Sequence, residues 1–357
     1  MAWFLLFALA FVVVSVIVLR GDRLDYLDSN ILPQPNRAPS ESHHEVVASM
    51  KAFTAESQGL KGRARLQTIR DYMDNMHDGK VFASSFTPVS EGDIRGEWVV
   101  APGVDTRRRV LYLHGGAFMM GSPRSHRSIT NRLSEVANAA VFALDYRLLP
   151  EHSRLDGIAD CQNGYRWILQ NGPDGPEPLD FLVVSGDSAG GNLTLMTIAW
   201  ARDEGLRPAD AAVALSPSTD TTLTAPSMKT NVASDPMLGP AFGKLTRFPA
   251  IIWWWATLFT SRMKPSDPRN SPLRGDLSGL PPVLVQASEA EMLLDDARRY
   301  VNKAQAAGTD ARLQCWPHMV HVWQIFTPDL PEAEDAFERI GEFLVSIDAT
   351  VEEELAA

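Results

Sequence analysis

Cysteine is scarce in this chain, which has only two among its 357 residues. Cys161 and Cys315 lie far apart, in segments that we expect to be a helix and a strand, so they cannot form the dense disulfide framework of a small secreted domain. Internal repeats and low-complexity segments are also lacking, which excludes solenoid arrays. We therefore expect free, buried thiols in a globular fold with one large core, or one core and a lid.

Positive charge is in deficit. Lysine and arginine together number 33 against 44 acidic residues, so the formal net charge is -11, and it is spread along the chain instead of concentrated in a tail. Binding to nucleic acid rests on cationic contacts to phosphate. Nucleic acid is therefore not an expected partner.

Apolar runs long enough to span a membrane are absent except at the N-terminus. Residues 2–19 of "MAWFLLFALAFVVVSVIVLR" carry no charge. At about 1.5 Å per residue, such a helix nearly spans a hydrocarbon core of about 30 Å. A cleaved signal peptide is the alternative, but it has a basic start and small residues at a cleavage site, and this segment has neither. We predict a retained single-pass transmembrane helix that anchors the protein to the membrane.

The segment after this helix, residues 20–79, is predicted to contain a connector and N-terminal cap helices. Arg20 and Arg23 follow the apolar run, so the positive-inside tendency places the remainder of the chain on the cytoplasmic side. A polar, proline-bearing stretch comes next. In "LQTIRDYMDNM", residues 66–76, apolar side chains recur at helical spacing, which predicts one amphipathic helix.

From residue 80 to residue 357, short apolar runs alternate with helical patterns. Runs such as "RRVLYLHGG", "DFLVVSG" and "PVLVQAS" read as strands, and "FLVVSG" is apolar throughout, as expected when helices cover both faces of a sheet. The alternation predicts an α/β fold with a mostly parallel central sheet flanked by helices. Residues 219–267, which include "FPAIIWWWATLF", break this alternation. We expect this insertion to form a helical cap together with the N-terminal region.

A serine flanked by glycines follows one of the predicted strands. In "VVSGDSAGGN", Ser188 lies between an apolar run and a helical stretch, two residues from both Gly186 and Gly190. A serine on a sharp strand-to-helix turn has a strained backbone, and side chains two residues away would collide with neighbouring segments. This is the G-x-S-x-G pattern of a nucleophile elbow. A glycine-rich turn whose serine caps the helix is the alternative, but the flanking strand and helix favour a nucleophile.

A second glycine-bearing loop ends an earlier strand in "VLYLHGGAF". In hydrolases with such an elbow, backbone N–H groups from this loop and from the residue after the serine bind the oxyanion of a tetrahedral intermediate. Gly115, Gly116 and Ala189 are the candidate donors. Each such donor contributes about 10²- to 10³-fold in rate. A plain strand-to-helix turn is the alternative interpretation.

Together with "DYRLLPEH", these two motifs resemble those of the hormone-sensitive-lipase-like branch of the α/β hydrolases, which includes many bacterial carboxylesterases. Those proteins carry H-G-G-G, D-Y-R-L-A-P-E-H and G-D-S-A-G-G in this order, and the resemblance extends from about residue 80 to the C-terminus. It implies an α/β-hydrolase fold and hydrolysis of short- to medium-chain acyl esters. Ala117 replaces the third glycine of the loop, which we expect to alter the acyl pocket. Leu149 replaces an alanine, which we expect to be a minor change.

The resemblance also implies an acid and a histidine after the serine. The acid of the family begins a D-x-L-x-D pattern after the next-to-last strand, and "QASEAEMLLDDARRY" matches it with Glu291 in the acid position. Glutamate is therefore expected here instead of aspartate. Glu289 breaks the spacing. Asp295 and Asp296 begin a helix, where carboxylates are expected simply because they favour its positive end.

Two histidines lie in "PHMVHVW", after the last predicted strand. In the family, the catalytic histidine lies in this loop before a bulky apolar position, so the resemblance assigns that role to His321, whereas His318 shapes the loop. A lone H-x-x-H without a third ligand is a weak metal motif, and we expect no metal. A Ser188–Glu291–His321 triad that forms a covalent acyl-enzyme requires no cofactor.

Other functions are compatible with these residues. Amide deacetylation and acyl transfer to a second alcohol use the same triad, and the arylacetamide deacetylases are similar to this chain in having an N-terminal anchor. The plant gibberellin receptors, which belong to the same broad family, bind a ligand after losing the catalytic histidine. This chain retains a full set of candidates, which disfavours a noncatalytic binding protein.

Overall fold

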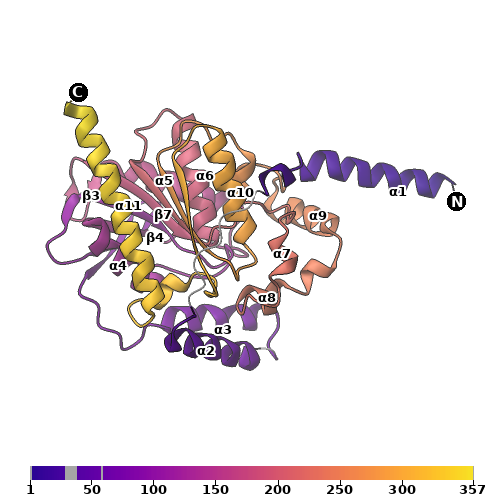
Figure 1. Ribbon diagram of the computed structural model, residues 1–357, viewed down its shortest axis with the longest axis horizontal. Coiled ribbons are helices and arrows are strands. Elements are labelled where there is room, and N and C mark those ends of the chain that lie inside the picture. Colours follow the sequence, from indigo (N-terminus) through magenta and orange to yellow (C-terminus); the bar gives the residue numbers. More distant parts are fainter. Residues whose placement is uncertain (1, 29–37, 58, 357) are drawn as a thin grey trace.

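The computed structural model describes residues 2–28, 38–57 and 59–356, and a twisted sheet of eight strands lies at its centre (Figure 1). The strand order is β1-β2-β4-β3-β7-β8-β9-β10. The pairs β1/β2 and β2/β4 are antiparallel, and every pair from β4 to β10 is parallel. The strands are β1 Ser85–Glu91, β2 Ile94–Val100, β3 Asp105–Leu113, β4 Ala139–Leu144, β7 Phe181–Asp187, β8 Ala211–Leu215, β9 Val283–Ser288 and β10 Ala311–Trp316, and β5 Asn171–Gly172 pairs separately with β6 Gly175–Pro176. The predicted mostly parallel α/β sheet is confirmed.

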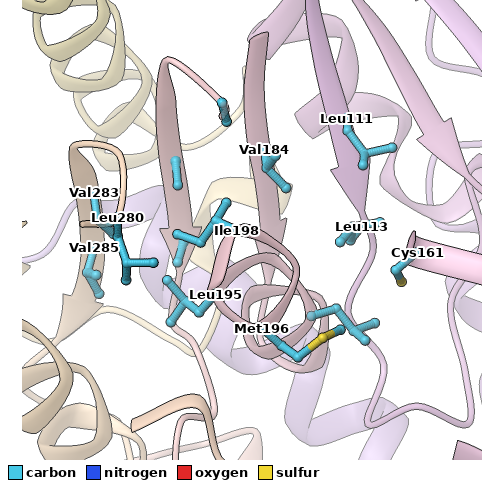
Figure 2. Close-up of a cluster of buried hydrophobic side chains, with 14 of the residues drawn as sticks. Leu111, Leu113, Cys161, Val184, Leu195, Met196, Ile198, Leu280, Val283 and Val285 are labelled. Carbon is cyan, nitrogen blue, oxygen red and sulfur yellow. The ribbon is translucent and has the colours of Figure 1, made fainter. Parts of the chain in front are cut away.

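Helices cover both faces of this sheet. The two faces are visible along β3, where Leu111 and Leu113 belong to one apolar layer and Val110 and Tyr112 to the other. Figure 2 shows the layer beneath α6, in which Leu195 and other apolar side chains of that helix meet strand residues. This layer is covered by α5 Arg154–Ile168, α6 Ala189–Asp203 and α10 Leu294–Ala306, and the opposite layer by α4 Arg127–Ala137 and α11 Pro331–Ala356.

Both cysteines lie in the first of these layers. Cys161 in α5 and Cys315 in β10 are free and buried, as the sequence led us to expect. Burial raises the pKa of the Cys315 thiol to about 12. Neither thiol is therefore poised to act as a nucleophile at neutral pH.

The remaining helices come from the N-terminal region and from the insertion between β8 and β9. They are α1 Ala2–Ser15, α2 Glu41–Ser57 and α3 Gly62–Asn75, followed by α7 Ser227–Thr230, α8 Leu238–Phe242 and α9 Ala250–Ser261. Short helical turns occur at Asp25–Leu27, Arg124–His126, Leu245–Arg247, Pro272–Arg274 and Trp323–Phe326. The predicted amphipathic helix at residues 66–76 corresponds to α3. Most of the predicted polar connector, residues 29–37, lies outside the described residues.

The three tryptophans of α9 each donate a hydrogen bond from the indole N–H to a neighbouring segment. Trp253 donates to the carbonyl of Leu245, and Trp254 donates to that of Thr222. Trp255 donates to Ser15 Oγ at 3.0 Å and stacks on Phe11 of α1. These side chains therefore pack the insertion against itself and against the N-terminal helix.

The predicted transmembrane helix is wrong. Across the described ranges, no helix is both long enough and apolar enough to cross a membrane. The α-helical part of the apolar run, α1, has 14 residues and gives way to a π-helical turn, Val16–Arg20, in which Leu19 is buried and its carbonyl accepts from Ser266 N–H. An α-helix of that length extends about 21 Å, which is short of a hydrocarbon core of about 30 Å. The membrane-anchored, cytoplasmic-facing placement inferred from a span is overturned with it.

Candidate active site

Ser188 occupies the turn between β7 and α6. Its backbone has φ 53° and ψ -113°, a conformation that costs a residue other than glycine energy and that occurs where surrounding structure enforces it. Close packing around the turn enforces this conformation. A Cβ added to Gly190 would lie 1.8 Å from the Leu113 carbonyl oxygen, and a Cβ added to Gly186 would lie 2.4 Å from the same oxygen. Only glycine fits at these two positions. The turn therefore holds the serine side chain at the carboxyl end of the sheet.

His321 and Glu291 lie beside this serine, although 133 and 103 residues separate them from it in the chain. His321 Nε2 is 2.8 Å from Ser188 Oγ, and His321 Nδ1 is 2.7 Å from Glu291 Oε2. The histidine is 2% exposed and the glutamate is fully buried. The three side chains thus form a continuous hydrogen-bonded relay that begins at a partly accessible hydroxyl.

The carboxylate of Glu291 is held on both oxygens. Oε1 accepts from the hydroxyl of Ser216, which follows β8, and from the backbone N–H of Ser288, both at 2.8 Å. The same Ser216 hydroxyl accepts from the N–H of Val322, next to the histidine. Oε2 remains for His321. It accepts the Nδ1 proton of the ring, and this contact directs Nε2 toward Ser188.

The charge state of His321 follows from this contact. Burial disfavours the imidazolium, but the hydrogen bond and the negative charge of Glu291 outweigh it and raise the pKa of His321 above its usual 6.5. The buried carboxylates of Asp235 and Asp187 act in the same direction. An imidazole in this setting accepts a proton readily, as a general base must.

The loop after β3 differs from the expected arrangement at one residue. The Gly115 N–H, predicted to face an oxyanion, donates to Asp187 Oδ1 at 2.9 Å. Within the described part of the chain, the N–H groups of Gly116, Ala117 and Ala189 have no hydrogen-bond acceptor. Gly116 and Ala117 both have positive φ, 109° and 54°, so the loop turns sharply there. The structure thus leaves Gly116, Ala117 and Ala189, and not Gly115, with N–H groups available to a ligand.

These observations can be compared with known proteins. Residues 110–325 match the profile of a family described as alpha/beta hydrolase fold. An acetyl-hydrolase from Streptomyces hygroscopicus is 38% identical over 256 residues, which cover 72% of this chain and 81% of that protein. The carboxylesterase/phospholipase LipF from Mycobacterium tuberculosis is 36% identical over 276 residues, or 76% of this chain and 71% of that protein.

Solved structures give the same result. An esterase from the bacterial hormone-sensitive lipase family superposes with a TM-score of 0.75 at 35% identity, covering 86% of this chain and 98% of that one. EstE5, in a crystal soaked with p-nitrophenyl butyrate, superposes with a TM-score of 0.72 at 35% identity, covering 85% and 98%. This chain belongs to the alpha/beta hydrolase fold family, in its hormone-sensitive-lipase-like branch.

Two of the rival acids of this hydrolase bind backbone N–H groups of the insertion. Asp295 accepts from the backbone N–H of Ser227, and Asp296 accepts from those of Thr219 and Asp220, so both tie the insertion to the start of α10. Glu289 lies before the turn, and its carbonyl accepts from the Asn231 side chain. None of them is among the contacts of His321.

The second histidine of the loop lies apart from the relay. His318 is exposed and has φ 66°, so it takes part in the turn that follows β10. In the chain as described, no group of three or more histidine, cysteine, aspartate or glutamate side chains could hold a metal ion. A surface groove of about 660 Å³ lies between Ile17, Leu258 and Pro268, and none of the three relay residues lines it.

Sequence reasoning about the hydrolase missed three contributors to the site. Ala117 differs from the third glycine of the family loop, but the backbone N–H that it offers is present in every residue except proline, so the residue type does not reveal it. Ser216 and Asp235 gave no signal, because their roles rest on contacts with residues more than 50 positions away. The one available hint was that Ser216 directly follows a predicted strand, at the sheet edge where the sites of such folds lie.

Proposed function

We propose that this hydrolase cleaves carboxylic esters with Ser188 as nucleophile, His321 as general base and Glu291 as the residue that orients the base. The observation that carries the proposal is the relay of 2.8 and 2.7 Å that joins the three side chains. Its residues follow the chain order serine, acid, histidine of α/β hydrolases. The names of the relatives, esterase and carboxylesterase, agree with ester substrates.

In the first half of the reaction, Ser188 Oγ attacks the ester carbonyl carbon while its proton passes to His321 Nε2. The imidazolium that forms lies against the buried Glu291 carboxylate, which stabilises the charge and keeps the proton on Nδ1 directed toward Oε2. The carbonyl oxygen becomes an oxyanion. When the tetrahedral intermediate collapses, the C–O bond to the alcohol breaks, the alcohol takes the proton from Nε2, and an acyl-serine remains.

The oxyanion is assigned to the backbone donors of Gly116, Ala117 and Ala189. Their N–H groups have no acceptor in the described structure, and Ala189 stands at the N-terminus of α6, where the helix dipole favours negative charge. Donors that are already in place stabilise the transition state without reorganisation. Ala117 in place of glycine leaves its N–H unchanged and adds one methyl group at the loop.

The second half of the reaction repeats these steps with water. His321 Nε2 takes a proton from water as its oxygen attacks the acyl carbon, and the second intermediate collapses with return of that proton to Ser188 Oγ. A carboxylic acid is released. Every proton is carried by His321, so the sequence of steps requires no cofactor.

Short- to medium-chain acyl esters are the proposed substrate class. In support, one relative is named acetyl-hydrolase, and the crystal of EstE5 was soaked with p-nitrophenyl butyrate, a four-carbon acyl ester.

A p-nitrophenyl ester series from acetate to palmitate tests this proposal on the full chain. We expect kcat/KM to be highest at four to eight acyl carbons, and Ser188→Ala to abolish turnover. A matched p-nitroanilide and an acceptor alcohol, run beside the best ester, separate ester hydrolysis from amide hydrolysis and acyl transfer. Turnover of the anilide at a rate equal to that of the ester, or no turnover of any ester, would show the proposal to be wrong.

A further inference from the structure

A second buried histidine–carboxylate pair lies directly behind the proposed nucleophile. Asp187, which precedes Ser188, is 3% exposed, and its Oδ1 lies 3.4 Å from Nε2 of His126, which is 1% exposed. The same oxygen accepts from the Tyr112 hydroxyl at 2.6 Å and from the Gly115 N–H at 2.9 Å. The pair thus joins the end of β7, the turn Arg124–His126 and the loop after β3.

Both ring nitrogens of His126 face acceptors. Nε2 faces the Asp187 carboxylate, and Nδ1 lies 2.8 Å from Ser125 Oγ and 3.2 Å from the carbonyl of Ser122. The Ser125 hydroxyl donates its own proton to the Ser122 carbonyl, so its oxygen accepts from Nδ1. With Nδ1 directed at the serine oxygen and Nε2 at the carboxylate, both contacts of the ring favour its protonated form.

The charges of the pair support each other. Burial disfavours a charged His126, yet the charge and hydrogen bonding of Asp187, together with the Ser122 carbonyl and the charge of Asp74, raise the pKa of the histidine. Conversely, burial opposes the charge of Asp187, but the charge and hydrogen bond of His126 lower the pKa of this carboxyl. The neighbouring His114 is fully buried, and its pKa is lowered to about 3, first by burial and then by the charge of His126. Each member of the pair therefore favours the charged form of the other.

The loop itself is built around the Asp187 carboxylate. A Cβ on Gly115 would lie 2.0 Å from Asp187 Oδ2, so the backbone passes directly over this side chain. The Gly115 N–H is bound to Oδ1, and the preceding carbonyl, that of His114, accepts from the Tyr146 hydroxyl at 2.6 Å. These contacts fix the peptide that leads into Gly116 and Ala117.

We propose that Asp187 and His126 are positioning residues, which hold the loop after β3 so that the Gly116 and Ala117 N–H groups face the oxyanion. The inference rests on the proposed ester hydrolysis, since it assigns these N–H groups to the tetrahedral intermediate. Neither side chain touches the reacting atoms. Asp187 acts on the loop through the hydrogen bond from Gly115 N–H, and His126 acts through Asp187 and through the Ser122 carbonyl.

The network continues outward to the N-terminal region. The Ser122 hydroxyl donates to Asp74 of α3 at 2.5 Å, and Arg70, one turn earlier on the same helix, donates to the carbonyl of Met119 at 2.8 Å. Two side chains of α3 therefore bind the C-terminal part of the loop, at Met119 and Ser122, while Asp187 binds its N-terminal part at Gly115. The loop is restrained at both ends by residues outside the relay.

Affinity for a transition-state analogue separates positioning from general destabilisation. A trifluoromethyl ketone forms a hemiketal with the serine, and its oxyanion requires the same donors as the intermediate, whereas ground-state ester binding does not. The variants are Asp187→Asn and His126→Gln, with Tyr112→Phe as a milder change that removes only one hydroxyl from Asp187. Arg109→Met is the matched control, because it removes a fully buried charge from β3, the strand that leads into the loop, at a point distant from it.

We expect Asp187→Asn to lower kcat about 10²-fold, the loss typical of a small misplacement of catalytic groups, with KM changed less than about twofold. The inhibition constant of the ketone should weaken by the same factor as kcat/KM. Tyr112→Phe should show smaller losses in the same proportion, and Arg109→Met should lose thermal stability but keep kcat and ketone affinity.

The proposal is overturned if the ketone binds Asp187→Asn and His126→Gln as tightly as it binds the wild type, or if Arg109→Met loses kcat to the same extent at equal stability. Should Asp187→Asn fail to fold, the proportion between kcat/KM and ketone affinity in Tyr112→Phe decides the question. Failure of the proposed function is distinguishable, because the wild-type protein itself would then turn over no ester.

Discussion

Asp235 Oδ2 accepts a hydrogen bond of 2.9 Å from the backbone N–H of Met292, the residue after Glu291. Its other oxygen accepts from the N–H groups of Met237 and Leu238, and Asp235 itself is 1% exposed. Nearby, the Asn231 side chain donates to the carbonyls of Glu289 and Glu291. The insertion is therefore hydrogen-bonded to the turn that carries the proposed catalytic acid.

The first prediction concerns the hydrogen bond between Asp235 and this turn. Asp235→Ala leaves the buried Met292 N–H without an acceptor, which should lower the free energy of unfolding by about 1–3 kcal/mol. Because the turn that carries Glu291 is loosened, kcat should fall more than KM rises. Urea titration and ester kinetics measure the two effects. Ser234→Ala, whose exposed hydroxyl contacts the carbonyl of Ala290, is the control and should change neither.

The second prediction concerns pH. His321 must be neutral to take the serine proton, so kcat/KM should rise with pH through the pKa of His321 and level off above it. Since Glu291 raises that pKa, the midpoint should lie above 6.5. Glu291→Gln removes the charge, so its residual activity should show a midpoint at lower pH and a kcat lower by up to about 10⁴-fold. An unchanged midpoint in this variant would contradict the assignment of the acid.

The third prediction separates the two histidines of the last loop. His321→Ala removes the imidazole whose Nε2 lies 2.8 Å from Ser188 Oγ and should reduce kcat by at least about 10³-fold. His318→Ala changes an exposed side chain in the same loop and should keep kcat within about threefold. Ester hydrolysis under saturating substrate measures both. A loss in His318→Ala comparable to that in His321→Ala would show that the roles are misassigned.

The fourth prediction tests the packing of the elbow. Gly190→Ala would place a methyl group 1.8 Å from the backbone oxygen of Leu113, which cannot move without shifting β3. We expect a loss of at least about 3 kcal/mol in the free energy of unfolding, together with loss of esterase activity. Gly59→Ala, at a glycine whose added Cβ meets nothing within 4 Å, is the control and should be stable and active. Chemical denaturation of both variants measures the difference.

The fold class could be predicted from the sequence because its signals are local. Continuous apolar runs such as "FLVVSG" indicate strands covered on both faces, and β7 is buried along its whole length. The elbow is equally local, since the collision that demands glycine at positions 186 and 190 is specified by a five-residue pattern. Hydropathy alone predicts the N-terminal span. Hydropathy does not register that the run ends as an α-helix at Ser15 and packs against α9.

The assignment of loop donors shows where sequence reasoning ended. Gly115 and Gly116 are adjacent and equivalent in the motif, yet the Gly115 N–H donates to the Asp187 carboxylate, whereas the Gly116 N–H has no acceptor among the residues that the structure describes. Ala117, which departs from the motif, also has an N–H without an acceptor in the described ranges. The direction of a peptide plane depends on dihedral angles and on distant partners, and neither can be read from residue types.

The sequence by itself determined the identity and order of the candidate residues and the sheet that carries them, because short-range sterics and hydrophobic periodicity are encoded within a few positions of the chain. Only the tertiary structure decided which backbone donors are free, how Asp235 holds the turn after Glu291, and that Asp187 and His126 form a buried pair behind Ser188. Those relationships join segments separated by tens to hundreds of residues. They depend on distances and burial that exist only once the sheet, the loops and the insertion have packed together.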